Sequence, residues 1–160
     1  MSEFIKRWVL ELLFRGQQLY WRWRAPLIVG VRGIIVHRGR LLLIRHNYGQ
    51  RHLWYLPGGA VKRKETLVEA LCREVREELH VDIQVERLHG IYYNFSHGAS
   101  DHVIVFTASL DDATGIRPGW EIAAFDFFPL DALPDAMSPA TRRRIEEYLT
   151  DARHLEYRPW

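Results

Sequence analysis

The segment spanning residues 66–79 constrains the chain most, because it predicts a long helix with several acids on one face. Thr66 and Glu69 form a capping-box pattern at its start, and neither proline nor glycine interrupts it. Three carboxylates fall within an arc of about 100° on one helix face: Glu74, Glu77 and Glu78. An apolar stripe lies beside them: Leu71, Val75 and Leu79. We therefore expect a helix that packs by one side and presents its acids at the margin.

Carboxylates at this spacing repel one another, and each like-charge pair costs a helix roughly 0.2–0.5 kcal/mol. A solvated surface helix would balance them with Arg73 and Arg76. Alternatively, a bound hard divalent cation neutralises the repulsion among the three carboxylates. Mg²⁺ prefers oxygen ligands and is usually shared with substrate phosphates, and Mn²⁺ accepts the same donors. Such a site polarises a phosphoryl oxygen and activates water, which predicts Mg²⁺ as a cofactor, Mn²⁺ as its substitute, and hydrolysis of a phosphoanhydride.

Composition restricts the class of protein further. A chain of 160 residues is long enough for one well-filled domain and too short for two. Its net charge of +2 gives no reason to expect a stable nucleic-acid partner. Cys72 is the only cysteine and cannot form an intrachain disulfide, so a cytoplasmic location is expected. No apolar run reaches the roughly 18 residues that span a bilayer, and Glu11 interrupts the first apolar stretch, so no cleaved signal peptide is expected.

The remaining pattern alternates strands with helices. Five strands are expected: residues 27–36, 41–46, 82–93, 102–110 and 122–128. A second helix is expected over residues 140–149, with Ser138 and Pro139 at its start. Strands interleaved with a middle and a late helix indicate an α/β protein, a sandwich around a mixed sheet. We place one domain at residues 26–160.

Residues 1–25 differ from this domain and predict a basic, amphipathic helical arm. Five cations and two glutamates give the arm a charge of +3, which leaves −1 for the rest of the chain. Three roles remain open for it. The arm packs on its own domain, forms a homodimer contact, or makes a peripheral membrane contact with anionic lipids.

The acidic helix also belongs to a longer motif. Gly59 is followed by five residues, Glu65, seven residues, and then the run from Arg73 to Val81. This spacing resembles the Nudix box, the signature of the Nudix hydrolase superfamily (MutT-like), and every specified position matches except His80, where the signature has glycine. The resemblance extends over residues 27 to about 150.

The resemblance implies an α/β/α sandwich and Mg²⁺-dependent hydrolysis of a nucleoside diphosphate linked to another moiety. It implies that the metal is held by the three helix carboxylates, Glu74, Glu77 and Glu78. It also makes Glu74 and Glu78 candidate catalytic residues, with Glu74 a candidate base, and pairs Arg73 with Glu65 to orient the helix. Glu121 resembles a position that adds a late metal ligand in some members.

Substrate-binding residues are less constrained by the sequence. Gly58 and Gly59 form a bend beside the acidic helix, Arg45 is a candidate for phosphate binding, and Tyr93 is a candidate for stacking on a nucleobase. Each has a plainer alternative: a turn, a surface cation or core packing. Some family branches carry a proline or tyrosine 15 to 18 residues after the box. Residues 96–99 contain neither, so they favour no particular nucleotide derivative.

His80 is the one departure from the signature. A glycine just past a helix end usually serves a left-handed backbone, and another residue there costs on the order of 1 kcal/mol, with histidine among the tolerated ones. We interpret His80 as a backbone variation, because every metal-binding carboxylate is present. The alternative is a nucleotide-binding or regulatory module with weak or no turnover.

Overall fold

The computed structural model describes residues 8–16, 20, 26–95, 100–150 and 158–160. Its centre is a six-stranded mixed sheet with the strand order β5-β2-β1-β4-β3-β6. The strands are β1 (Leu27–His37), β2 (Arg40–His46), β3 (Gln84–Asn94), β4 (Ser100–Ser109), β5 (Ile122–Pro129) and β6 (Arg158–Pro159). The pairs β1–β4 and β3–β6 are parallel, and the other pairs are antiparallel. The expected α/β sandwich is confirmed, and β6 is an addition that is too short to be recognised in the sequence.

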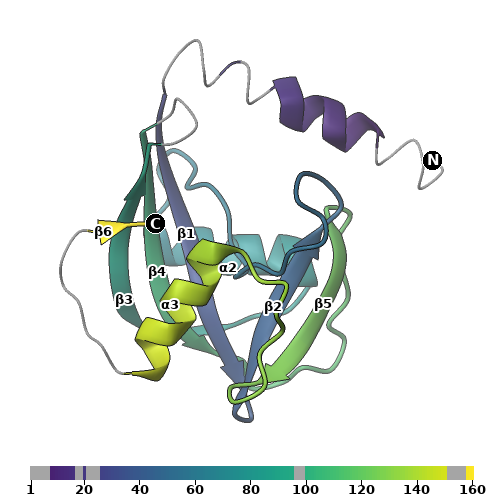
Figure 1. Ribbon diagram of the computed structural model, residues 1–160, viewed down its shortest axis with the longest axis vertical. Coiled ribbons are helices and arrows are strands. Elements are labelled where there is room, and N and C mark those ends of the chain that lie inside the picture. Colours follow the sequence, from purple (N-terminus) through teal and green to yellow (C-terminus); the bar gives the residue numbers. More distant parts are fainter. Residues whose placement is uncertain (1–7, 17–19, 21–25, 96–99, 151–157) are drawn as a thin grey trace.

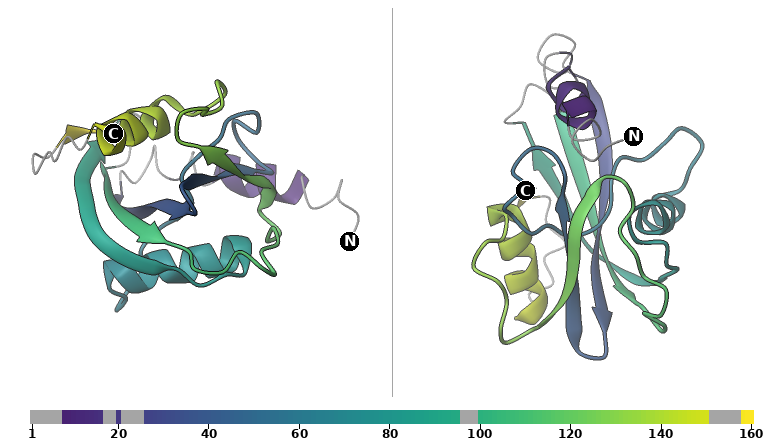
Figure 2. Two further views of the ribbon diagram at one scale, coloured as in Figure 1. Left: turned by 90° about the horizontal axis from the view of Figure 1, so that it is seen from below. Right: turned by 90° about the vertical axis from the view of Figure 1, so that its right-hand side faces the viewer.

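Two helices cover opposite faces of the sheet, as Figure 2 shows. Helix α2 (Leu67–Leu79) buries Leu71, Val75 and Leu79 in one apolar cluster, and α3 (Pro139–Leu149) contributes Ile145 to a second cluster on the other face. Thr66 caps α2 through the expected capping box with Glu69. The sheet is therefore covered on both sides, and α2 packs against the face that includes Val31 and Ile35 of β1.

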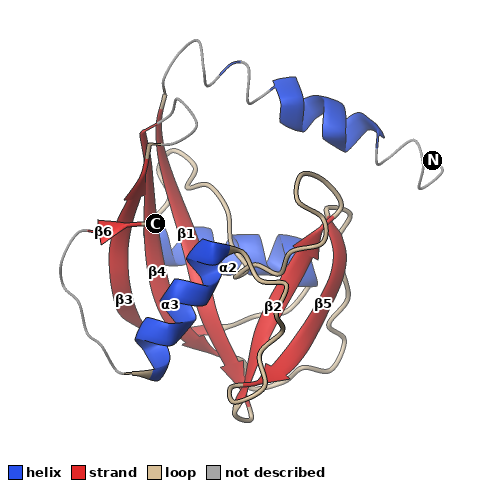
Figure 3. Ribbon diagram, in the orientation of Figure 1, coloured by secondary structure: helices blue, strands red, loops and turns tan. Residues whose placement is uncertain are grey.

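Strands β1 and β2 diverge from their shared hairpin, and Figure 3 shows them opening into a V. They pair directly only next to the turn, where Val36 faces Leu41. Farther along, the loop after β2 takes up the backbone groups of both strands. The Gly33 N–H donates to the Pro57 carbonyl at 3.0 Å, and the Val31 N–H donates to the Gly59 carbonyl at 2.8 Å. The residues before α2 are thereby held against the open end of β1.

The chain before β1 is helical over residues 8–16, which we call the N-terminal helix. It lies beyond the open end of the V in Figure 1. Leu10 is buried, and the Gly49 N–H donates to Glu11 Oε2 at 3.4 Å. Trp8, Leu12 and Leu13 are largely exposed. This part of the arm therefore contacts its own domain on one side and leaves an apolar side uncovered. No helix among the described residues is both long and apolar enough to cross a membrane.

Candidate active site

The bend before α2 needs glycine at two consecutive positions. Gly58 has a φ of +129°, and a Cβ there would lie 2.2 Å from the carbonyl oxygen of Val31. A Cβ on Gly59 would lie 2.4 Å from the carboxyl carbon of Glu74. The two glycines therefore let the loop pass between β1 and the acidic face of α2, so the backbone itself forms one side of the site.

Arg73 connects this loop to the helix. Its Nε donates to Glu65 Oε1 at 2.6 Å, and its Nη2 donates to Glu65 Oε2 and to the Ala60 carbonyl, both at 3.0 Å. Its Nη1 also donates to Glu74 Oε1 at 2.6 Å. The Arg73 side chain and the Lys62 N–H hold the pKa of Glu65 down to about 2. The Arg73–Glu65 contact is the one that the resemblance implied, and it fixes the loop against α2.

Glu78 is the buried carboxylate of the site. It lies on α2, is 8% exposed, and accepts the Gly58 N–H at 3.0 Å. Burial raises its pKa to about 8, and the nearby Glu74 and Glu121 carboxylates raise it further, while Arg32 and the Gly58 N–H oppose the shift. A buried carboxyl group beside other carboxylates favours the binding of a cation.

The other carboxylates surround Glu78 from two elements. Glu77 is more exposed and accepts from Lys62 Nζ at 3.3 Å. Glu121, just before β5, accepts from the Tyr48 hydroxyl at 3.3 Å. Burial raises the pKa of Glu121, and the carboxylates of Glu74 and Glu77 add to the shift. All four predicted metal ligands therefore line one pocket, although Glu121 is more than forty residues away in the sequence.

The donor set fits a hard cation by its chemistry. All four groups offer oxygen, which Mg²⁺ and Mn²⁺ prefer. Burial raises the pKa of Glu78 and of Glu121, and neighbouring carboxylates add to both shifts. Among the described residues no three acidic, histidine or cysteine side chains converge on a common point. Glu74 and Glu77 instead turn toward Arg73 and Lys62, the nearest cations.

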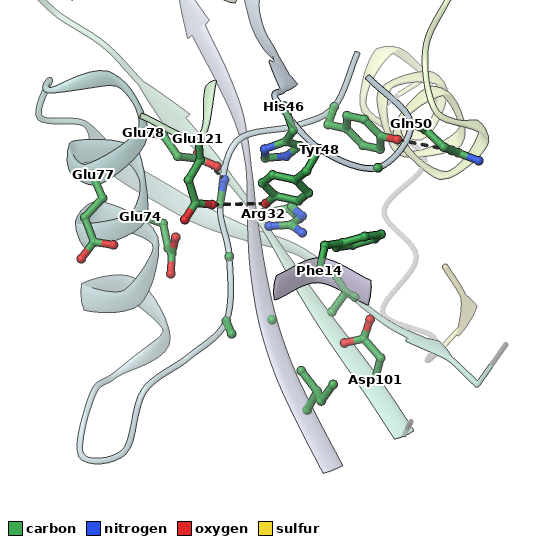
Figure 4. A pocket seen from close by; sticks show the side chains of 18 of the residues that line it. Phe14, Arg32, His46, Tyr48, Gln50, Glu74, Glu77, Glu78, Asp101 and Glu121 are labelled. Carbon is green, nitrogen blue, oxygen red and sulfur yellow. Dashed lines mark hydrogen bonds between the residues drawn. The ribbon is translucent and has the colours of Figure 1, made fainter. Parts of the chain in front are cut away.

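The carboxylates open into a pocket of about 590 Å³, drawn in Figure 4. Strand β1 contributes Arg32 and the end of β2 contributes His46, while Asp101 on β4 lies at the border opposite the acids. Tyr48, from the loop after β2, stands between Glu121 and Phe14. The pocket therefore joins an acidic side to an aromatic side, with a guanidinium between them.

Comparison with known proteins identifies the family. The family model for the NUDIX domain matches residues 26–149. The chain belongs to the Nudix family. Nudix hydrolases are pyrophosphatases that act on acid anhydrides, and the chain is a hydrolase of this class.

Two curated relatives and one solved structure illustrate the similarity. The chain is 32% identical over 136 residues to an ADP-ribose pyrophosphatase of Methanocaldococcus jannaschii, which covers 84% of this chain and 80% of the relative. It is 39% identical over 126 residues to a MutT-like protein of Streptomyces ambofaciens, with 78% of each chain covered. A Nudix hydrolase structure from Nitrosomonas europaea superposes with a TM-score of 0.74 at 22% identity, covering 84% of this chain and 79% of that one. The expected family and fold are confirmed.

The structure does not bring every candidate residue to this Nudix pocket. The Arg45 guanidinium lies over the Trp54 indole, 4.7 Å from the ring centroid. Tyr93, near the end of β3, stacks on Phe95 with centroids 5.0 Å apart. Neither residue lines the pocket that contains the carboxylates, so Arg45 and Tyr93 have no place in the substrate site that we propose.

Arg32, His46 and Tyr48 are among the pocket residues that were missing from the sequence prediction. Arg32 interrupts an apolar strand, and this lone charge is the signal that was available for it. His46 stacks on Tyr48 with centroids 4.9 Å apart, and burial, with Arg32 adding to it, lowers the pKa of His46 to about 4. Burial, with Glu121 adding to it, raises the pKa of Tyr48. The His46 and Tyr48 rings are therefore neutral near pH 7. Of these three residues, Arg32 carries the positive charge.

His80, the departure from the Nudix box, occupies the left-handed conformation with φ 58° and ψ 33°. Its backbone N–H donates to the Arg76 carbonyl at 3.0 Å, which closes the helix end. Its ring Nδ1 lies 3.2 Å from the Arg117 carbonyl oxygen. Histidine therefore adopts the backbone conformation that glycine favours, and the four site carboxylates still line the pocket.

Replacing His80 by glycine should raise the free energy of unfolding by about 0.5–1 kcal/mol, because the left-handed backbone no longer carries a Cβ. We expect kcat to stay within about two-fold of the wild type. Urea unfolding and steady-state kinetics test both statements. Arg38→Gly, in the hairpin turn with φ 48°, is a matched control away from the pocket. A ten-fold drop in kcat for His80→Gly would show that the histidine ring serves the site.

Proposed function

We propose that the chain is a Mg²⁺-dependent pyrophosphohydrolase that cleaves the phosphoanhydride bond of a nucleoside diphosphate linked to another moiety. One observation carries the proposal: four carboxylates from α2 and the start of β5 meet at one pocket, with the Arg32 guanidinium inside it. The 32% identity to a relative named ADP-ribose pyrophosphatase supports this substrate class.

The carboxylates have distinct roles in this proposal. Glu74, Glu77, Glu78 and Glu121 would hold the cation. A bound Mg²⁺ supplies Lewis-acid polarisation of a phosphoryl oxygen and lowers the pKa of water. Glu74 is also the candidate base that takes the proton of the attacking water, and the Arg73 hydrogen bond to its Oε1 orients the carboxylate. The water oxygen bonds to phosphorus, the bridging P–O bond breaks, and two phosphate products leave.

The remaining groups bind and orient the substrate. The Arg32 guanidinium offers donors to the non-bridging oxygens of the diphosphate. The backbone at Gly58 and Gly59 lines the pocket and lets the substrate approach the loop closely. Arg73 and Glu65 do not line the pocket, and they act by holding the loop and Glu74 in place.

A substrate panel tests the proposal. ADP-ribose, nucleotide sugars, nucleoside triphosphates and dinucleoside polyphosphates are incubated with Mg²⁺, with Mn²⁺ and with a chelator, and phosphate products are separated by chromatography. We expect turnover with either metal on at least one compound, and none with chelator. Nucleotide binding without any product would contradict the proposal and favour the alternative, a binding module with the Nudix fold.

A further inference from the structure

Phe14 brings the N-terminal helix into the wall of the pocket. The residue lines the pocket although it lies outside the matched NUDIX domain, residues 26–149. Its ring centroid is 5.4 Å from that of Tyr48, with an angle of 38° between the planes. The same ring approaches Gly49, where a Cβ would lie 3.5 Å from Phe14 Cζ.

The N-terminal helix is held in this position by polar and apolar contacts. Glu11 Oε2 accepts the Gly49 N–H at 3.4 Å, and Glu11 Oε1 pairs with Arg15 at 3.2 Å, one helical turn along. Leu10, which is one helical turn before Phe14, is buried with 5% exposure. Phe14 therefore belongs to the domain-facing side of the helix, and its partners are residues of the loop after β2.

Phe14 extends an existing row of rings. Tyr55 is 5.5 Å from His46, His46 is 4.9 Å from Tyr48, and Tyr48 is 5.4 Å from Phe14, measured between centroids. The Tyr48 hydroxyl bonds to Glu121 on the acidic side. Phe14 is thus one ring farther than Tyr48 from the carboxylates, and Figure 4 shows it on the opposite side of Tyr48 from Glu121.

This arrangement matches the two ends of a nucleotide. The substrate phosphates would bind on the side of the carboxylates and Arg32. The nucleobase would bind on the side of the aromatic rings, because every base presents a π-face that can stack on a ring. We infer that Phe14 stacks on the nucleobase of the substrate, so the N-terminal helix contributes to substrate selection. The inference rests on the proposed function for the class of ligand, and it makes residues outside the family domain part of the binding site.

Nucleotide binding tests the inference without requiring hydrolysis. The full chain is titrated with AMP, GMP, CMP and UMP by calorimetry in the presence of Mg²⁺. Phe14→Ala should weaken binding about ten-fold or more, since removing one stacking ring typically has an effect of that order. Phe14→Leu should weaken it about five-fold or more, because leucine keeps apolar contact without a π-face. Phe14→Trp should stay within about three-fold of the wild type.

Leu13→Ala is the matched control, because Leu13 is the next residue of the same helix and is 61% exposed. It should bind all four nucleotides as the wild type does. Wild-type affinity in Phe14→Leu would overturn the inference, since apolar packing alone would then explain the contact. Absence of nucleotide binding to the wild type would overturn it as well. If Phe14→Ala does not fold, Phe14→Leu and Phe14→Trp decide the question.

The outcome is separable from that of the proposed function. Loss of binding in the Phe14 variants with no hydrolysis by the wild type would support the stacking role and contradict the enzyme. Hydrolysis by the wild type with unchanged nucleotide affinity in Phe14→Leu would support the enzyme and contradict the stacking role. Selectivity gives a second readout: Phe14→Leu should raise KM for the best substrate about five-fold and leave kcat within about two-fold.

Discussion

Glu78→Gln should lower kcat roughly 10²- to 10⁴-fold while leaving the fold intact, because a carboxylate that binds the cation is replaced by a neutral amide. The amide oxygen can still accept the Gly58 N–H, so the loop should keep its position. The substitution also removes a buried acid whose pKa is raised to about 8, and unfolding should occur at an equal or higher temperature in metal-free buffer.

Turnover of the best panel substrate, calorimetric titration with Mg²⁺ and a thermal melt measure the three effects of Glu78→Gln. Glu86→Gln is the matched control, since Glu86 is an exposed glutamate on β3. It should leave all three measurements at wild-type values. Unchanged kcat and unchanged Mg²⁺ affinity in Glu78→Gln would contradict the proposed metal site, however well the variant folds.

Gly58→Ala should lower the free energy of unfolding by about 3 kcal/mol or more. Its φ of +129° is strained for any residue with a side chain, and its Cβ would lie 2.2 Å from the Val31 carbonyl oxygen. That oxygen belongs to the backbone of β1, in the middle of the sheet, so the clash cannot be relieved by rotating a side chain. Urea unfolding followed by far-UV circular dichroism measures the loss.

Gly115→Ala separates the two causes of the stability loss expected for Gly58→Ala, which are backbone strain and the steric clash. Gly115 also has a positive φ, +79°, but no atom lies within 4 Å of a Cβ placed there. We expect a loss of about 1 kcal/mol for Gly115→Ala, from backbone conformation alone. Equal losses in the two variants would mean that the loop before α2 moves away from β1 easily, although backbone hydrogen bonds hold it there.

Features that depend on near neighbours in the chain were predictable. Helix α2 was expected over residues 66–79 and spans Leu67–Leu79, because a capping box and i, i+4 packing act within one or two turns. The left-handed backbone at His80 was expected for the same reason, since it follows directly from the helix end. The acidic face of α2 needed only helical periodicity.

The choice of substrate-binding residues was not predictable in this way. Arg32 and Arg45 are both charged residues in largely apolar strands, and the residues around them do not show which of the two lines a pocket. Arg32 lines the pocket, whereas Arg45 lies over Trp54, because β1 and β2 diverge beyond their hairpin and a loop fills the space between them. Tyr93 similarly has Phe95 as its stacking partner.

The amino-acid sequence by itself determined the family, the acidic helix and the loop that precedes it, since these follow from spacing within 23 residues, Gly59 to Val81. Only the tertiary structure decided which distant groups complete the site. Glu121 reaches the acidic face of α2 because β5, which follows it, pairs with β2. Arg32 lies near the acids because the loop before α2 is hydrogen-bonded to β1. Phe14 lines the pocket because the N-terminal helix packs on Tyr48. Each of these contacts closes a long stretch of chain, and such contacts form only when packing of the whole domain compensates for the lost chain entropy.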